Sequence, residues 1–161
     1  MKKGFDRMPF LQDKEILMGF MNLHDAFLNA SLQYSFMNKC PVVGGNSDPE
    51  KFFVSNRGRF ERAWVTFLYV LIESWQSKQM EIVRAYVKSV TDTSILESLL
   101  SKGNQDGSIA KMREARGYMC HRDRRGYWDN GRLAVIGNLK YHEDLHMAFS
   151  EVLIDVFKKN H

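Results

Sequence analysis

The sequence predicts an all-α fold, an up-and-down helical bundle of four to five helices that forms a single domain over residues 1–161. Three observations predict it. Apolar residues recur every three or four positions along long segments, clusters of Gly, Pro and Asn separate those segments, and no repeat or linker divides the chain. A chain of 161 residues with 44% hydrophobic and 26% charged residues suits one folded domain with a sizeable core.

The first predicted helix runs from about Asp13, a plausible N-cap, to about Asn38. It ends before Pro41 and the loop-forming residues Gly44–Pro49. Apolar residues recur along it at three- and four-residue spacing: Ile16, Phe20, Leu23, Phe27, Leu28 and Leu32.

The second predicted helical segment, about Asn56 to Val90, is long enough that we expect a bend or a break near Ser77 and Lys78. A short helix follows from Thr93 to Leu100. We expect the sequence Lys-Gly-Asn at residues 102–104 to end it.

A further short helix is predicted over about Ser108 to Cys120. A short β-hairpin is predicted near residues 126–136, where an Asn-Gly turn is flanked by aromatic and β-branched residues. The last helix runs from about Asn138 to Lys159. Its apolar face is formed by Tyr141, Leu145, Ala148, Phe149, Val152 and Val156.

The sequence favours a cytoplasmic protein that does not span a membrane. The first ten residues lack the apolar run of a signal peptide. The longest apolar stretch, Trp64–Ile72, has nine residues and is interrupted by Thr66, whereas a spanning helix needs about 20. Two cysteines, Cys40 and Cys120, are too few for a disulfide framework, and we expect both to be reduced thiols.

The basic character of the chain is local. Residues 111–132 carry seven Lys or Arg and three Asp or Glu, a surplus of four, which equals the formal net charge of +4 for the whole chain. Outside residues 111–132, positive and negative charges are equal in number. On charge alone, the patch is either a solvated basic surface, the commoner case, or a binding surface for an anionic partner such as nucleic acid. RNA becomes the expected partner through the residues described next.

Arg116 and His121 lie five residues apart within this patch. Histidine titrates near neutral pH and can move a proton to or from a ribose hydroxyl, and arginine can hold a phosphate through its planar fork of donors. These two residues are therefore the predicted catalytic pair, and the chemistry requires no cofactor. Candidate residues for binding the nucleic-acid strand are Arg113, Arg122, Arg124, Arg125 and Tyr127, and Glu73 is a candidate to orient Arg113 or Arg116.

The run Arg113-Glu-Ala-Arg116-Gly-Tyr-Met-Cys-His121-Arg-Asp, on a late helix of a predicted bundle, resembles the Arg-x4-His helix of the HEPN superfamily. The resemblance implies an all-α fold that forms homodimers, with the two motif helices facing each other across a shared cleft. It implies metal-independent endoribonuclease activity of the toxin or defence type, a cognate protein antitoxin, and Arg116 and His121 as the catalytic pair. Gly117 departs from the pattern, because active members usually carry a polar residue after the motif arginine.

A second interpretation gives these residues a structural role. His121 then acts as a cation near a helix C-terminus, and Arg116 forms a salt bridge with Glu73, Glu114 or Asp123. The protein would in that case be a non-catalytic helical bundle that binds a partner or a small ligand.

The sequence His142-Glu-Asp-Leu-His146 matches the zinc-binding pattern His-Glu-x-x-His on a predicted helix. The third zinc ligand usually lies well downstream, but only fifteen residues follow His146, and Phe149 and Val152 occupy the positions of the extended motif. We therefore interpret the two histidines as solvated or half-buried residues beside the apolar face and predict no metal. His142 and His146 remain the weaker alternative as ligands.

Overall fold

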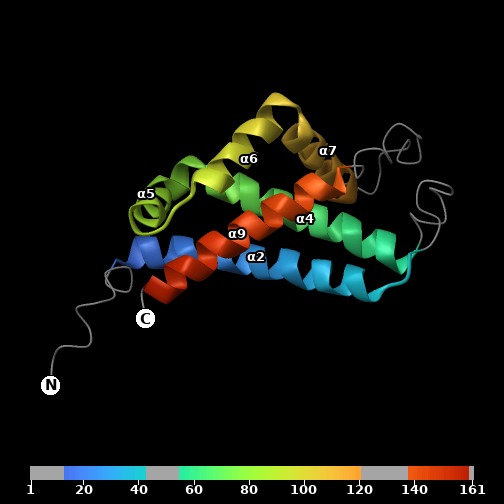
Figure 1. The fold of residues 1–161 in the computed structure, drawn as a ribbon, viewed down its shortest axis with the longest axis horizontal. Coiled ribbons are helices and arrows are strands. Elements are labelled where there is room, and N and C mark those ends of the chain that lie inside the picture. Colours follow the sequence, from blue (N-terminus) through green and yellow to red (C-terminus); the bar gives the residue numbers. More distant parts are fainter. Residues whose placement is uncertain (1–12, 43–54, 121–137, 160–161) are drawn as a thin grey trace, which may run out of the picture.

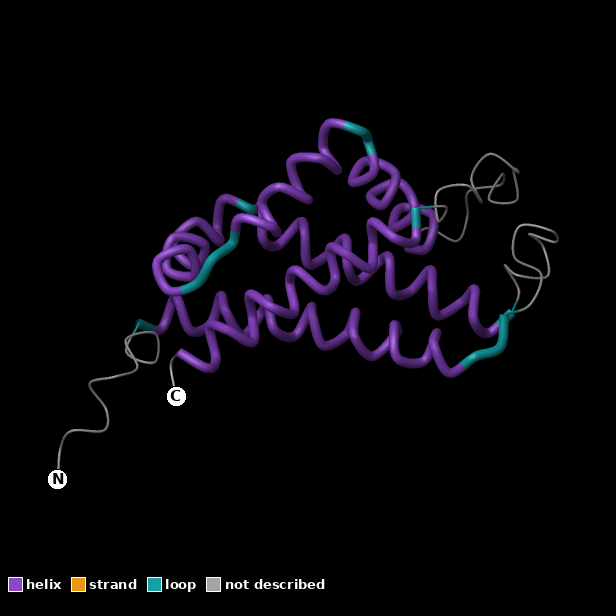
Figure 2. The backbone as a smooth tube through the Cα atoms, viewed as in Figure 1, coloured by secondary structure: helices purple, strands orange, loops and turns teal. Residues whose placement is uncertain are grey.

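The structure is a computed structural model that describes residues 13–42, 55–120 and 138–159, with the backbone alone described for residues 118–120. Every regular element in these ranges is helical, which confirms the all-α bundle (Figure 2). The elements are α2 (Lys14–Lys39), α4 (Asn56–Gln76), the 3-10 helix η2 (Lys78–Met80), α5 (Glu81–Val90), α6 (Ser94–Gln105), α7 (Ser108–Cys120) and α9 (Leu139–Lys159). These ranges contain six α-helices, more than the four to five predicted. The β-hairpin predicted near residues 126–136 lies outside them.

Helix α2 begins where the sequence predicts. The Asp13 carboxylate accepts hydrogen bonds from the backbone N–H groups of Glu15 at 3.0 Å and Ile16 at 3.1 Å. At the other end, the Arg57 guanidinium donates to the carbonyl oxygens of Met37 at 3.1 Å and Cys40 at 3.2 Å. One arginine on α4 therefore satisfies the last carbonyls of α2 and joins the two helices.

The break predicted near Ser77 and Lys78 is confirmed, because α4 ends at Gln76 and α5 begins at Glu81. The Arg84 guanidinium of α5 reaches back and donates to the carbonyl oxygens of Trp75 and Ser77. The carbonyls of the last turn of a helix lack intrahelical partners, so the arginine caps the C-terminal end of α4. The Ser77 carbonyl also accepts from the Met80 N–H at 3.2 Å.

The end predicted for α6 at residues 102–104 is wrong, since the helix continues to Gln105. Gly103 is buried inside the helix, and a Cβ atom there would lie 1.9 Å from the Tyr141 hydroxyl oxygen. The glycine is required by this close approach of α9. The chain turns instead at Gly107, whose φ of 78° lies in the left-handed region that favours glycine.

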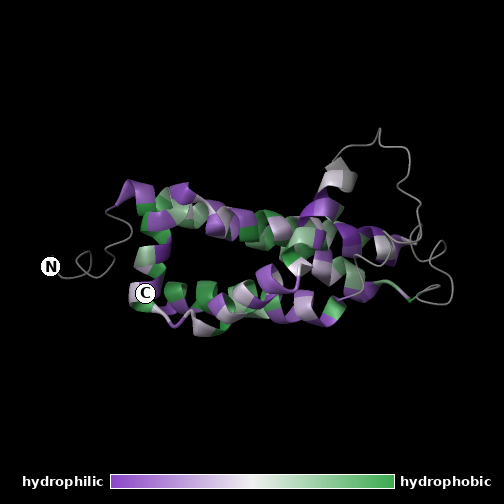
Figure 3. Ribbon diagram, turned by 90° about the horizontal axis from the view of Figure 1, so that it is seen from above, coloured by the Kyte–Doolittle hydropathy of each residue, from purple (hydrophilic) through white to green (hydrophobic). Residues whose placement is uncertain are grey.

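The helices form two layers. Helices α2 and α4 run antiparallel as one layer, and α9 crosses them as the second (Figure 1). Seen from above, α5 spans the two layers at the end where α2 begins (Figure 3). Helix α7 packs against α4 near the other end of the molecule.

The core lies between the layers. Its largest fully buried side chains include Trp64, Trp75, Phe20 and Phe149. The predicted apolar face of the last helix is confirmed, since its six residues are all buried. On α2, however, Leu28 and Leu32 point away from the core and are each 49% exposed. Within the ranges given above, no helix has the length and apolar character needed to cross a membrane.

Candidate functional site

Helix α7 holds the described part of the predicted site. The Asp106 carboxylate accepts a hydrogen bond of 2.8 Å from the Ser108 N–H. Hydrogen bonds from the Ser108 side chain and from this N–H lower the pKa of Asp106. Ile109 and Met112 are buried and anchor one face of α7. Arg113 directly follows Met112, so it lies off this buried face and is exposed.

Arg116 is held by two residues of α4. Its guanidinium Nη1 lies 2.6 Å from Glu73 Oε2, and its Cζ lies 5.7 Å from the centre of the Tyr69 ring. The side chains of Arg116 and Glu73 are 37% and 50% exposed, so this is a surface ion pair. Such a pair contributes at most about 1 kcal/mol to stability, but together with the ring it restricts where the guanidinium points.

The sequence identified Glu73 as a partner of Arg113 or Arg116, and the structure places it beside Arg116. Glu73 is exposed. Tyr69 was missed by the sequence interpretation, which treated α4 as a core helix. The available signal was its position four residues before Glu73, because residues so spaced lie on one helix face.

Tyr69 is buried and close to both arginines. Burial raises the pKa of the Tyr69 hydroxyl, and the Glu73 carboxylate adds to this, whereas Arg113 and Arg116 act in the opposite direction. The four residues therefore form one electrostatic group where α4 and α7 meet. Arg113, one turn before Arg116, is exposed.

The remaining predicted site residues lie outside the described part of the chain. They are His121, Arg122, Arg124, Arg125 and Tyr127. Helix α7 ends at Cys120, one residue before His121. The structure thus brings together Arg113, Arg116 and Glu73, and the pairing of Arg116 with His121 stays a prediction.

Gly117 lies within α7. No atom of the described residues comes within 4 Å of the position that a Cβ atom would take at Gly117. Packing within this part of the chain therefore does not require a glycine.

The two histidines of the zinc-like motif are buried, which corrects the expectation that they are solvated or half-buried. His142 and His146 are 1% and 6% exposed. The Trp64 indole N–H donates to His146 Nδ1 at 3.1 Å, and the Ser31 hydroxyl lies 3.3 Å from His146 Nε2. Because an indole N–H can only donate, Nδ1 must accept, and neutral His146 carries its proton on Nε2 and donates to Ser31.

This environment keeps both histidines neutral. Burial lowers the pKa of His142 to about 4 and that of His146 to about 4. Both ring nitrogens of His146 have partners within the protein, so neither faces an open coordination position. Among the described residues, no three His, Cys, Asp or Glu side chains are arranged to hold a metal ion.

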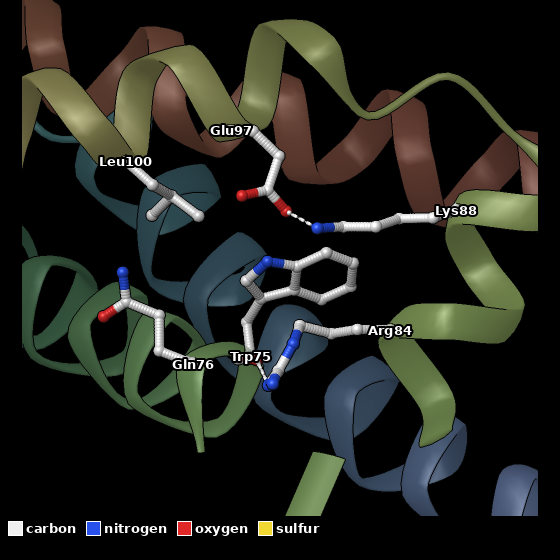
Figure 4. A pocket seen from close by; sticks show the side chains of 6 residues that line it. All are labelled: Trp75, Gln76, Arg84, Lys88, Glu97 and Leu100. Atoms are coloured by element: carbon white, nitrogen blue, oxygen red, sulfur yellow. Dashed lines mark hydrogen bonds and ion pairs between the residues drawn. The ribbon is translucent and has the colours of Figure 1, made fainter. Parts of the chain in front are cut away.

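A surface pocket of about 200 Å³ lies over Trp75 (Figure 4). It is lined by Trp75, Gln76, Arg84, Lys88, Glu97 and Leu100. Its charged groups are already paired: Lys88 Nζ lies 2.9 Å from Glu97 Oε1, and Arg84 binds the end of α4. Ligand pockets are usually larger than about 300 Å³ and mostly apolar, so this pocket does not favour a small-ligand function.

Compared with models of known protein families, with curated proteins and with solved structures, the chain gives no match. Its function has to be inferred from its own residues and geometry.

Proposed function

We propose that this protein binds RNA on the surface formed by α7 and the basic residues that follow it, and that it cleaves the bound strand without a metal ion. The observation that carries the proposal is the placement of Arg116. Its guanidinium is held between the Glu73 carboxylate and the Tyr69 ring, on the helix that leads into the most basic part of the sequence.

This placement suits the recognition of a phosphate. A guanidinium has five N–H donors, and the ion pair with Glu73 engages Nη1. The other N–H groups of the guanidinium can donate to two phosphate oxygens, in the bidentate geometry that arginine favours. Because Tyr69 and Glu73 already restrict the guanidinium, less rotational freedom is lost when the phosphate binds.

Cleavage would proceed by attack of the ribose 2′-oxygen on the adjacent phosphorus. His121 removes the 2′-hydroxyl proton as the new O–P bond forms, and Arg116 stabilises the added negative charge on the phosphate oxygens. The bond from phosphorus to the 5′-oxygen then breaks, that oxygen takes up a proton from water, and His121 returns its proton to water. The products are a 2′,3′-cyclic phosphate and a 5′-hydroxyl, and the protons balance without any cofactor.

The test compares purified wild-type protein with Arg116→Ala and His121→Ala variants on mixed RNA in EDTA. We expect wild-type cleavage that leaves 2′,3′-cyclic phosphate ends and that both substitutions abolish. Arg59→Ala is the matched control, because Arg59 is an exposed arginine near the start of α4, and it should retain full activity. The absence of wild-type cleavage would exclude the catalytic part of the proposal.

Binding is tested separately by fluorescence anisotropy with single-stranded RNA. A wild-type protein that binds RNA through Arg113 and Arg116 without cutting it would be the non-catalytic bundle, the alternative to which Gly117 points. If wild-type protein binds no RNA, the whole proposal fails.

The dimer with facing motif helices, which the HEPN resemblance implies, and a protein antitoxin belong to this proposal as expectations. Co-purification of a second protein with the wild-type chain would identify such a partner. Loss of that protein from an α7 variant would locate its binding surface.

A further inference from the structure

The outer face of α2 is apolar and nearly uncharged. Between Glu15 and Lys39, the only Asp, Glu, Lys or Arg is Asp25. Large apolar side chains point outward along this face: Met18, Met21, Leu28, Leu32 and Phe36. With Asp25 between Met21 and Leu28, successive residues are three or four positions apart, as in a helix face that packs against another helix.

Helix α9 extends this surface. The Tyr34 hydroxyl donates to Glu143 at 3.3 Å, and His24 packs edge-on against Phe157, so α2 and α9 run antiparallel as neighbours. Glu143 and Phe157 belong to the same helical stripe as Met147 and Ile154, which are exposed. We define the α2 face as these two α9 residues together with Met18, Met21, Asp25, Leu28, Leu32 and Phe36.

The α2 face is large for the surface of a monomer. Six of its apolar side chains are between 43% and 54% exposed. Together with Phe36 they present on the order of 600 Å², the upper end for an apolar patch on a monomer. A stable dimer buries about 800 Å² on each partner, and the polar residues flanking this face bring it close to that area.

We propose that the α2 face binds a second copy of this chain, with the two α2 helices antiparallel about a twofold axis near Phe27. A second copy fits because the same face is offered by both partners and is self-complementary. Full overlap of the two helices places Met18 opposite Phe36 of the second copy, and Leu32 beside Met21.

The charges select the antiparallel arrangement. In a parallel pair the two Asp25 carboxylates would meet within an apolar interface, which is unfavourable. In the antiparallel pair Asp25 lies opposite Asn29 of the second copy. The Asn29 amide donates one N–H to the Asp25 carbonyl oxygen of its own helix at 2.9 Å, and its second N–H can donate to the carboxylate. At the ends, Lys39 of one copy lies opposite Glu15 of the other.

The first test is the mass of the full chain in solution, measured by sedimentation or light scattering. We expect a wild-type dimer, and we expect Leu28→Glu combined with Leu32→Glu to raise its dissociation constant at least tenfold. Both leucines are exposed, so far-UV circular dichroism should stay unchanged. Ile95→Glu, at a 63% exposed position of α6, is the control and should stay dimeric. A wild-type monomer at about 100 µM overturns the proposal.

The second test checks the orientation by cysteine cross-linking, with Cys40 and Cys120 replaced by serine. Leu28→Cys lies next to the proposed axis and should form a disulfide-linked dimer. Met18→Cys should not, because the two copies of residue 18 would be about 27 Å apart along the helices. Cross-linking through both positions would indicate a parallel pair and overturn the proposed arrangement.

Helices α2 and α7 lie on opposite sides of α4 (Figure 1), so a dimer formed through the α2 face differs from the one that the HEPN resemblance implies. A dimer that survives the two glutamate substitutions but is lost on substitution of α7 would overturn the inference. The proposed RNA cleavage does not depend on the outcome, because no residue of the α2 face belongs to the proposed RNA site.

Discussion

Gly103 and Gly117 both lie inside helices, but only Gly103 touches another helix. A Cβ atom at Gly103 would lie 1.9 Å from the Tyr141 hydroxyl, whereas at Gly117 it would meet no described atom within 4 Å. We expect Gly103→Ala to lower the free energy of unfolding by about 1–3 kcal/mol through overpacking. Gly117→Ala should raise it by up to about 1 kcal/mol, because alanine is the better helix former. Urea unfolding of both variants measures the difference, and two changes of the same sign would contradict the packing described here.

His142 and His146 make stability depend on pH. Their pKa of about 4 in the folded protein is below the ordinary value of 6.5, so the unfolded chain binds more protons between these two values. Stability is therefore full above pH 6.5 and is lost as the pH falls towards 4, by on the order of 3 kcal/mol per histidine. Urea unfolding between pH 4 and 7 measures this loss, and His142→Met should make it smaller. An unchanged loss in that variant would show that His142 is not the cause.

Glu61 makes stability depend on pH in the opposite direction to the two histidines. Burial raises its pKa to about 7 despite Arg57 and Arg62, so the folded protein binds more protons above pH 4.5 than the unfolded chain. Its contribution to stability is lost as the pH rises from 4.5 through 7. Glu61→Gln, which stays neutral, should remove this decline and leave the acid side of the profile unchanged. A wild-type profile that the substitution does not alter between pH 5 and 8 would be inconsistent with a buried carboxyl.

At the scale of elements, Arg84 links the end of α4 to α5. Arg84→Met keeps most of the aliphatic side chain but leaves the carbonyls of Trp75 and Ser77 without this donor, which should cost about 1–3 kcal/mol of stability. Lys88→Met, one turn further along α5, is the control. It removes only the exposed ion pair with Glu97 and should cost less than about 1 kcal/mol. Thermal unfolding of the two variants compares the effects, and equal losses would contradict a capping role for Arg84.

The helices could be predicted from local signals in the sequence. Asp13 gives the start of α2, and the length of the segment after Asn56 indicated the break at Ser77. Gly103 led to the wrong end for α6, because a glycine in a helical sequence usually indicates a helix end. Its actual cause, the close contact with Tyr141 of α9, cannot be seen in the sequence. The real stop, Gly107, is identified by its backbone conformation.

The candidate site was predictable only in part. The sequence placed Glu73 beside Arg113 or Arg116, and the structure shows it beside Arg116. The role of Arg116 in catalysis stays a prediction. The spacing of Tyr69 from Glu73 places both on one face of α4, but the contact of Tyr69 with Arg116 depends on α7 packing on α4 and could not be predicted. For the same reason the burial of His146 could not be read from the sequence: it depends on Trp64, 82 positions away.

At the scale of the whole molecule, charge and apolar surface are separated. The charge surplus of residues 111–132 begins on α7, and α2, which carries most of the apolar α2 face, lies on the other side of α4 (Figure 1). A second copy bound at α2 would leave the basic surface of each copy open. The molecule could then bind RNA and form a dimer without competition between the two surfaces.

The proposed RNA binding would be a local electrostatic effect at α7, which the salt dependence of binding tests. The logarithm of the binding constant for single-stranded RNA should fall linearly with the logarithm of salt concentration, by about 0.7 for each phosphate neutralised. Replacing Arg113 and Arg116 by alanine should therefore reduce the slope by about 1.4. The control replaces Lys158 and Lys159 at the end of α9, which removes the same charge at the opposite end of the molecule. If both double variants change the slope equally, binding responds to net charge alone and Arg113 and Arg116 do not form a defined RNA site.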